Sequence, residues 1–132
     1  MFTKNNGHQH VRHASADFTF ADFVSATYKE MIDLPANAVV IGGRLIADTA
    51  WNSATSDTLA VGDNTTAARY KAAQDVKTAA GLWALVPTGF RVTNTQLGLG
   101  ITWTGVGAAP TAGVGRLEVE YIVEGAADFS QR

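Results

Sequence analysis

Short runs in which apolar and polar residues alternate, set apart by glycine-containing turns, are the feature that most constrains this fold. The clearest run covers residues 117–124 and reads Leu-Glu-Val-Glu-Tyr-Ile-Val-Glu. Successive side chains of a β-strand point to opposite faces of a sheet, so this pattern predicts a strand with one buried face. Roughly seven or eight such runs predict an all-β protein, a β-sandwich with a jelly-roll-like topology.

The longest run covers residues 39–51, and its odd-numbered residues, among them Ile41 and Leu45, share one predicted face. Gly42 and Gly43 remove side-chain packing from the middle of this run. Paired glycines in a strand favour a β-bulge or a bend, so we expect one at this point.

The remaining segments give weaker patterns. Further strands are expected at residues 16–20, 25–34, 58–61, 82–86, 90–93 and 97–104. The strands at 97–104 and 117–124 flank a glycine-rich loop, so they are expected to form an antiparallel hairpin with a long tip. Residues 66–80 are rich in Ala, Lys and Gln, which favours a short helix, with an irregular loop as the alternative.

One face of the run at 97–104 carries only small side chains, those of Gly98, Gly100, Thr102 and Thr104. Glycine inside a strand often marks the close approach of another group. We therefore expect something to lie directly against this face.

A chain of 132 residues is long enough for one domain with a sizeable core. Residues 1–14 show neither helical nor strand periodicity and are predicted to form an extended N-terminal arm. Residues 15–132 are then a single β-sandwich domain. The arm buries too little surface to offset its conformational entropy, so it is expected to order only against a neighbour.

The composition excludes several classes of function. The chain has no cysteine, which excludes disulfides, thiolate metal sites and cysteine nucleophiles. Ten basic and twelve acidic residues give a formal net charge of −2, without any block of like charge, so no nucleic-acid partner is expected. No secretion signal and no apolar stretch of bilayer-spanning length is recognisable, so no membrane association is expected either.

No arrangement of residues indicates catalysis. His8, His10 and His13 lie on the predicted arm without a nearby carboxylate to orient them as metal ligands, so they are interpreted as solvated. No serine lies in the sharp turn that a serine hydrolase needs, and Glu118 and Glu120 are spaced along a solvated strand face. We predict no catalytic residue, no metal ligand, no cofactor and a non-enzymatic role.

A loop of oxygen-bearing residues begins after Gly62 and contains Asp63, Asn64, Thr65 and Thr66. Such oxygens could bind a calcium ion or a sugar. The same residues also suit an Asx turn, in which the aspartate accepts hydrogen bonds from backbone N–H groups just ahead of it. The turn is the favoured interpretation, and the ion or sugar site stays open.

Most aromatic residues fall on the apolar side of a predicted strand and are assigned to the core. Phe2 and Phe129 lie near the two polar termini instead, where an aromatic side chain suits docking into a pocket of a neighbouring protein. The candidate contacts with a neighbouring subunit are therefore Phe2, His8, His10, Arg12, His13 and Phe129.

Several runs resemble segments of small structural proteins of tailed bacteriophages. These runs are Val40-Ile41-Gly42-Gly43, residues 51–58, Gly62-Asp63, Pro87-Thr88-Gly89-Phe90, residues 102–107 and residues 115–121. Together they span roughly residues 36–125, which is most of the predicted domain.

The resemblance implies a virion protein, made in the host cytoplasm and located on the capsid surface as a decoration or cement protein. Such proteins are small β-sandwiches that assemble as dimers or trimers and reach across capsid joints with terminal arms. The implied partners are therefore the major capsid protein and further copies of the chain. The alternative is a carbohydrate- or receptor-binding module of a phage tail, because β-sandwiches also host that function.

Overall fold

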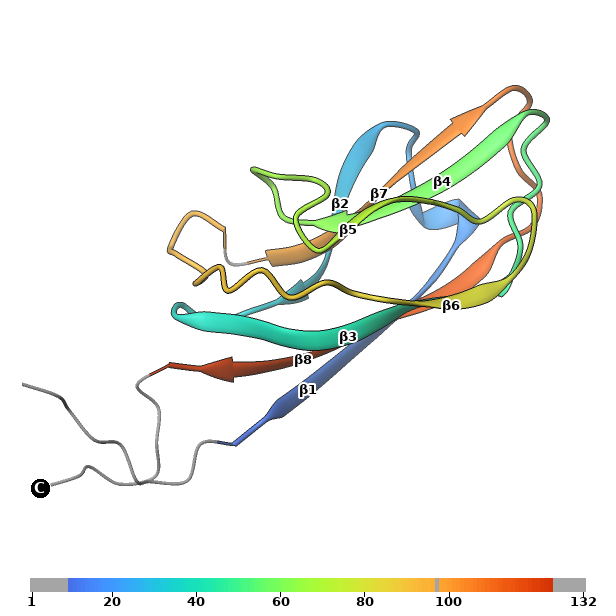
Figure 1. The fold of residues 1–132 in the computed structure, drawn as a ribbon. Coiled ribbons are helices and arrows are strands. Elements are labelled where there is room, and N and C mark those ends of the chain that lie inside the picture. Colours follow the sequence, from blue (N-terminus) through green and yellow to red (C-terminus); the bar gives the residue numbers. More distant parts are fainter. Residues whose placement is uncertain (1–9, 97, 125–132) are drawn as a thin grey trace, which may run out of the picture.

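The computed structural model describes residues 10–96 and 98–124, which form two antiparallel four-stranded sheets stacked face to face (Figure 1). The predicted β-sandwich is therefore confirmed. Its elements are β1 (Arg12–Thr19), the 3-10 turn η1 (Phe20–Asp22), β2 (Thr27–Asp33), β3 (Ala38–Thr49), β4 (Ser56–Gly62), β5 (Lys71–Asp75), β6 (Gly81–Ala84), β7 (Gly98–Val106) and β8 (Val114–Val123). Within the described residues, no helix is long and apolar enough to span a bilayer.

The strands pair in a nested order. One sheet runs β1-β8-β3-β6 and the other β2-β7-β4-β5, so the first strand pairs with the last, the second with the seventh, the third with the sixth and the fourth with the fifth. Each successive pair lies alternately in one sheet and then the other. This is the connectivity expected for a jelly-roll-like sandwich.

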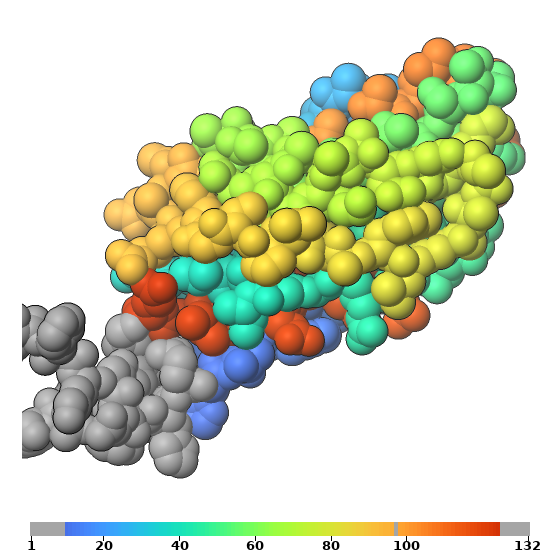
Figure 2. All heavy atoms as spheres, in the orientation of Figure 1, coloured from blue at the N-terminus to red at the C-terminus, as the bar shows by residue number. Residues whose placement is uncertain are grey.

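The core lies between the two sheets. Leu45 and Leu117 from one sheet and Leu59 and Ile101 from the other are fully buried. Phe18 lies against Phe23 and Trp51 at the end where β1 stops, with ring centroids 5.3 and 5.9 Å apart. Residues between β4 and β7 cover one side of the sandwich, as the green and yellow atoms in Figure 2 show.

The expected bulge in the longest strand is present, and it changes which residues face the core. The register of β3 against β8 shifts between Val40 and Gly42. Val40 is therefore buried, whereas Ile41 is 39% exposed. The predicted single face of odd-numbered residues is wrong at this point, because the extra residue of a bulge reverses the alternation.

Gly43 occupies a position that excludes a side chain. Its φ of +141° lies in a region that L-residues rarely adopt, and a methyl group there would collide with the carbonyl oxygen of Glu118. The neighbouring Gly42 has open space, since the nearest atom to a methyl group there is a Glu120 oxygen 3.9 Å away.

We therefore expect Gly43→Ala to lower the free energy of unfolding by about 2 kcal/mol or more, through backbone strain and the steric collision. Gly42→Ala is the matched control and is expected to change it by less than about 0.5 kcal/mol. Urea unfolding of both variants measures the difference. Equal losses at the two positions would contradict this account of the bulge.

At its two glycines, the small-residue face of β7 is covered by side chains of the paired strand β2, as its composition indicates. A methyl group on Gly100 would lie 2.8 Å from two ring carbons of Tyr28, and one on Gly98 would overlap the side chain of Glu30. The glycines thus make room for two larger side chains of the paired strand.

The helix expected within residues 66–80 is wrong. The segment contains β5, which pairs with β4 at the edge of the second sheet. Tyr70 and Val76, at the two ends of β5, are buried in the core. Helix propensity is a weak preference, and pairing with β4 together with burial of these two side chains overrides it.

The hairpin predicted from 97–104 and 117–124 is also wrong, although both strands exist. β7 pairs with β2 and β4, whereas β8 pairs with β1 and β3 in the other sheet. The glycine-rich loop therefore crosses between sheets. Residues 90–93 form no strand and make only an isolated bridge from Arg91 to Val39.

Candidate functional site

The predicted contact residues fall at the end of the first sheet where both terminal strands meet. β1 begins at Arg12, which pairs with Tyr121, and His13 pairs with Glu120. Arg12 and His13 therefore belong to the sheet, and the prediction of an arm that extends to residue 14 is wrong for these two residues. His10 is exposed just before the strand, while Phe2, His8 and Phe129 lie outside the described residues.

The pairing of β1 with β8 brings the start of β1 and the end of β8 to one corner of the sandwich (Figure 1). The alternation of apolar and polar residues along either strand does not predict that the start of β1 lies beside the end of β8. The side chains of Arg12 and His13 are exposed there, so both are available for contact with another protein.

The outer face of the first sheet carries a network of charged side chains. Arg44 Nε lies 2.6 Å from Glu118 Oε1, and Arg116 lies 3.6 Å from both Glu118 and Asp48. The hydrogen bond from Arg44 is the main cause that lowers the pKa of Glu118 below its ordinary value of 4.5. The glutamate is therefore ionised and paired at neutral pH, which suits a solvated structural face.

This pairing predicts a pH dependence of stability. Because the pKa of Glu118 is lower in the folded chain, its stabilising effect is fully present above the ordinary value of 4.5 and is lost as the pH falls through the folded value. We expect Glu118→Gln to flatten the acid side of a plot of Tm against pH. Arg44→Gln should flatten it similarly, and should have no further effect on this slope in the Glu118→Gln background. A slope that stays unchanged in both single variants would contradict the pairing.

The oxygen-rich loop after β4 forms the Asx turn that the sequence favours. Asp63 Oδ1 accepts hydrogen bonds from the backbone N–H groups of Thr65 and Thr66, at 2.9 and 2.7 Å. Its other oxygen accepts a hydrogen bond from Arg69 Nε at 2.5 Å, and the Arg69 guanidinium lies 3.6 Å over the Phe90 ring. Both carboxylate oxygens are thus engaged within the protein, which is the arrangement of a structural turn.

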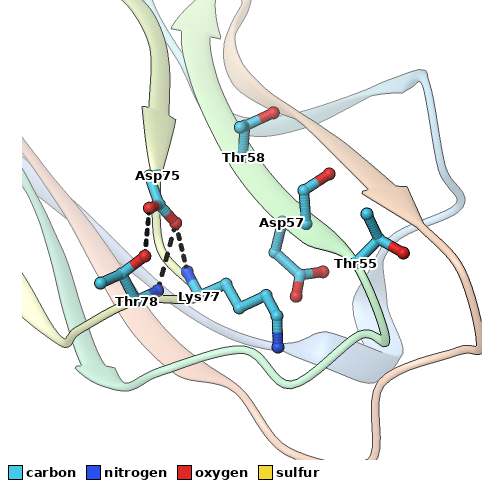
Figure 3. A pocket seen from close by; sticks show the side chains of 7 residues that line it. Thr55, Asp57, Thr58, Asp75, Lys77 and Thr78 are labelled. Atoms are coloured by element: carbon cyan, nitrogen blue, oxygen red, sulfur yellow. Dashed lines mark hydrogen bonds between the residues drawn. The ribbon is translucent and has the colours of Figure 1, made fainter.

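A hollow of about 440 Å³ lies where β4 begins and β5 ends (Figure 3). At its floor, the buried Asp57 accepts hydrogen bonds from Trp103 Nε1 at 2.9 Å and from Ser53 Oγ and N at 2.6 and 2.9 Å. The hollow is lined by Thr55, Ser56, Asp57, Thr58, Asp75, Lys77 and Thr78.

The carboxylates of the hollow are arranged for structural purposes. Asp57 has all three of its donors within the fold, and Asp75 accepts hydrogen bonds from Thr78 and from the Lys77 backbone (Figure 3). The hydrogen bond from the Thr78 hydroxyl is the main cause that lowers the pKa of Asp75. Asp75 therefore remains ionised at neutral pH and is not poised as a general acid. Among the described residues, no three His, Asp or Glu side chains cluster as metal ligands.

Asp57 is buried and Asp75 is exposed, so the two residues allow the effect of burial on the stability contributed by a hydrogen-bonded carboxylate to be measured. Asp57→Ala would leave the Trp103 and Ser53 donors without a partner, and we expect it to lower the free energy of unfolding by about 3 kcal/mol. For a domain of this size that corresponds to a fall in Tm of roughly 10 °C. Asp75→Ala removes a comparable set of hydrogen bonds at an exposed site and should lower Tm much less. Calorimetry on both variants makes the comparison, and similar falls in Tm would refute the role assigned to Asp57.

Comparison with known proteins finds similar folds among solved structures. No family model matches the chain, and no curated protein sequence matches it. Several solved structures, however, match the fold of the chain. The cyanophage Pam1 capsid contains a chain with a TM-score of 0.69 and 24% identity, covering 93% of this chain and 91% of that one.

Two further phage capsids contain similar chains. In the capsid of Ralstonia phage GP4 the TM-score is 0.65 at 20% identity, over 92% of this chain and 90% of that one. In the acid-stable capsid of Helicobacter pylori phage KHP30 it is 0.63 at 19% identity, over 87% and 89%. At this identity the likeness establishes a shared fold. Because most of both chains is matched each time, the three neighbours are also of about the same length as this chain.

Proposed function

We propose that this chain is a virion structural protein of a tailed phage, a capsid decoration or cement protein that binds the outer surface of the shell. The observation that carries the proposal is the match, over about nine tenths of both chains, to small chains in three phage capsids. A whole-chain match indicates a separate small component of the same architecture. The segments of this sequence that resemble phage structural proteins support the same conclusion independently.

The proposed role requires binding and no chemistry. The partners are the major capsid protein and further copies of this chain, in a dimer or trimer that bridges neighbouring shell subunits. A protein that binds only the assembled shell stabilises it by the free energy of binding. Many symmetric copies then add their contributions, so a modest contact for each copy suffices.

The terminal segments are proposed as one set of contacts. Arg12 and His13 are exposed where both termini leave the first sheet, and Phe2, His8, His10 and Phe129 belong to the segments on either side. An aromatic residue near each end of the chain suits the anchoring of one copy to a neighbour.

The test is co-sedimentation of purified chain with particles of the encoding phage that lack it, followed by cryo-electron microscopy of the decorated particles. We expect saturable binding and density at regular lattice positions. Deletion of residues 1–11 should weaken binding while leaving the thermal unfolding transition in place, because β1 begins at Arg12. Deletion of residues 1–14 is the informative contrast, since it also removes residues that pair with β8.

Absence of binding to particles would overturn the proposal. Density confined to the tail tip would favour the alternative of a carbohydrate- or receptor-binding tail module. Undiminished binding after deletion of residues 1–11 would leave the capsid role in place and remove the N-terminal segment from the contact.

A further inference from the structure

The end of the sandwich opposite the corner where β1 begins and β8 ends has an unusual surface. It is formed by four segments, residues 20–26, 50–55, 76–80 and 106–113, which we call the distal tip. Strand register places them together, because Thr19, Val114 and Thr49 are neighbours in one sheet and Ser56 pairs with Val106 in the other. In Figure 1 this end lies away from the corner where β1 begins and β8 ends.

The distal tip carries almost no charge. Asp22 and Lys77 are its only ionisable residues, and the Asp22 carboxylate already accepts a hydrogen bond from the Thr19 backbone at 2.8 Å. Val24 is 71% exposed and Val106 is 49% exposed. The four segments also carry the exposed alanines Ala21, Ala26, Ala54, Ala79, Ala80, Ala108 and Ala109.

The segments of the tip are held together by hydrogen bonds. Asn52 accepts from the backbone N–H groups of Thr111 and Ala112 and donates to the Thr111 hydroxyl. The Ala54 N–H donates to the Ala108 carbonyl oxygen at 3.2 Å.

Val24 and Val106 flank a further hydrogen-bonded contact. The Ser25 hydroxyl accepts from the Gly105 N–H and donates to its carbonyl oxygen, at 3.1 and 3.3 Å. The buried Asp57 fixes the base of the tip through Ser53. An apolar surface held in one shape loses little conformational entropy on binding, which favours a docking role.

We propose that the distal tip is a second contact of this chain with the outer surface of the phage shell, at an uncharged patch of the shell protein. The inference rests on the proposed function and extends it by assigning the binding end. The near absence of charge calls for a partner surface that is itself uncharged, since desolvating unpaired charges opposes binding. Acidic polymers and strongly charged protein surfaces are therefore poor partners for the distal tip.

The composition of the tip favours a shell over a second copy in solution. Stable interfaces between two free proteins are usually anchored by large aromatic or arginine side chains. Here the aromatic residues Phe23 and Trp51 are buried and Phe20 packs partly buried against the core, so the exposed apolar side chains of the tip are those of valine and alanine. A contact of this kind is weak for each copy and becomes effective on a lattice, where a second contact adds avidity.

The position of the tip explains how one chain can bridge two subunits. β3 has twelve residues and runs from the end where β1 begins and β8 ends to the distal tip. At about 3.3 Å per residue, the two ends lie roughly 40 Å apart. A chain that lies along the shell can thus contact one subunit through its terminal segments and another through its tip.

The test compares Val24→Asp with Val86→Asp in binding to undecorated particles of the encoding phage. Val86 is a matched control, because it is 61% exposed and lies outside the tip. We expect Val24→Asp to weaken binding about tenfold or more and Val86→Asp to change it less than about twofold. Val106→Asp is a second tip variant, and thermal unfolding shows which variants fold. Light scattering reports the oligomeric state.

The outcomes separate the two proposals. If the wild-type chain does not bind particles, the proposed function fails and the tip inference fails with it. If the wild type binds and the folded tip variants bind equally well, the tip inference is overturned and the capsid role stands. If Val24→Asp changes the oligomeric state in solution, the tip is a contact between copies and the inference is likewise overturned.

Discussion

Burial of two apolar sheet faces against each other is the constraint on which the rest of this molecule depends. Leu45 and Leu117 on one side meet Leu59 and Ile101 on the other, and all four are inaccessible to solvent. Burying a polar group in such an interior costs free energy unless the group finds a hydrogen-bond partner. Asp57 is accommodated because Ser53 and Trp103 supply hydrogen bonds to both of its oxygens.

The same constraint places the connecting segments at the two ends of the sandwich. Connecting segments remain outside the core because their backbone groups need hydrogen-bond partners. The nested strand order places the start of β1 and the end of β8 at one end and four of the connections at the other. An elongated body with two distinct ends is suited to joining two partners, and the charged network on the outer face of the first sheet keeps that flat surface solvated.

The elements that the sequence predicted well are those in which local pattern and tertiary environment agree. β8 alternates strictly, and its apolar residues Leu117 and Val119 are buried. The Asx turn at Asp63 forms because the aspartate reaches backbone groups only two and three residues ahead. β5 was missed because its alanines favour a helix locally, whereas its pairing with β4 is a contact between segments distant in sequence.

The sequence by itself determined the all-β class, the positions of most strands, the bulge beside Gly42 and Gly43, and the absence of cysteine chemistry. Each of these depends on residue type or on a period of two along the chain. Tertiary structure alone decided that β7 and β8 lie in different sheets, that Arg12 and His13 belong to β1, and that four separate segments form one tip with little charge. These features depend on which strands pair, and pairing is set by burial of the whole core, which no short window of sequence contains.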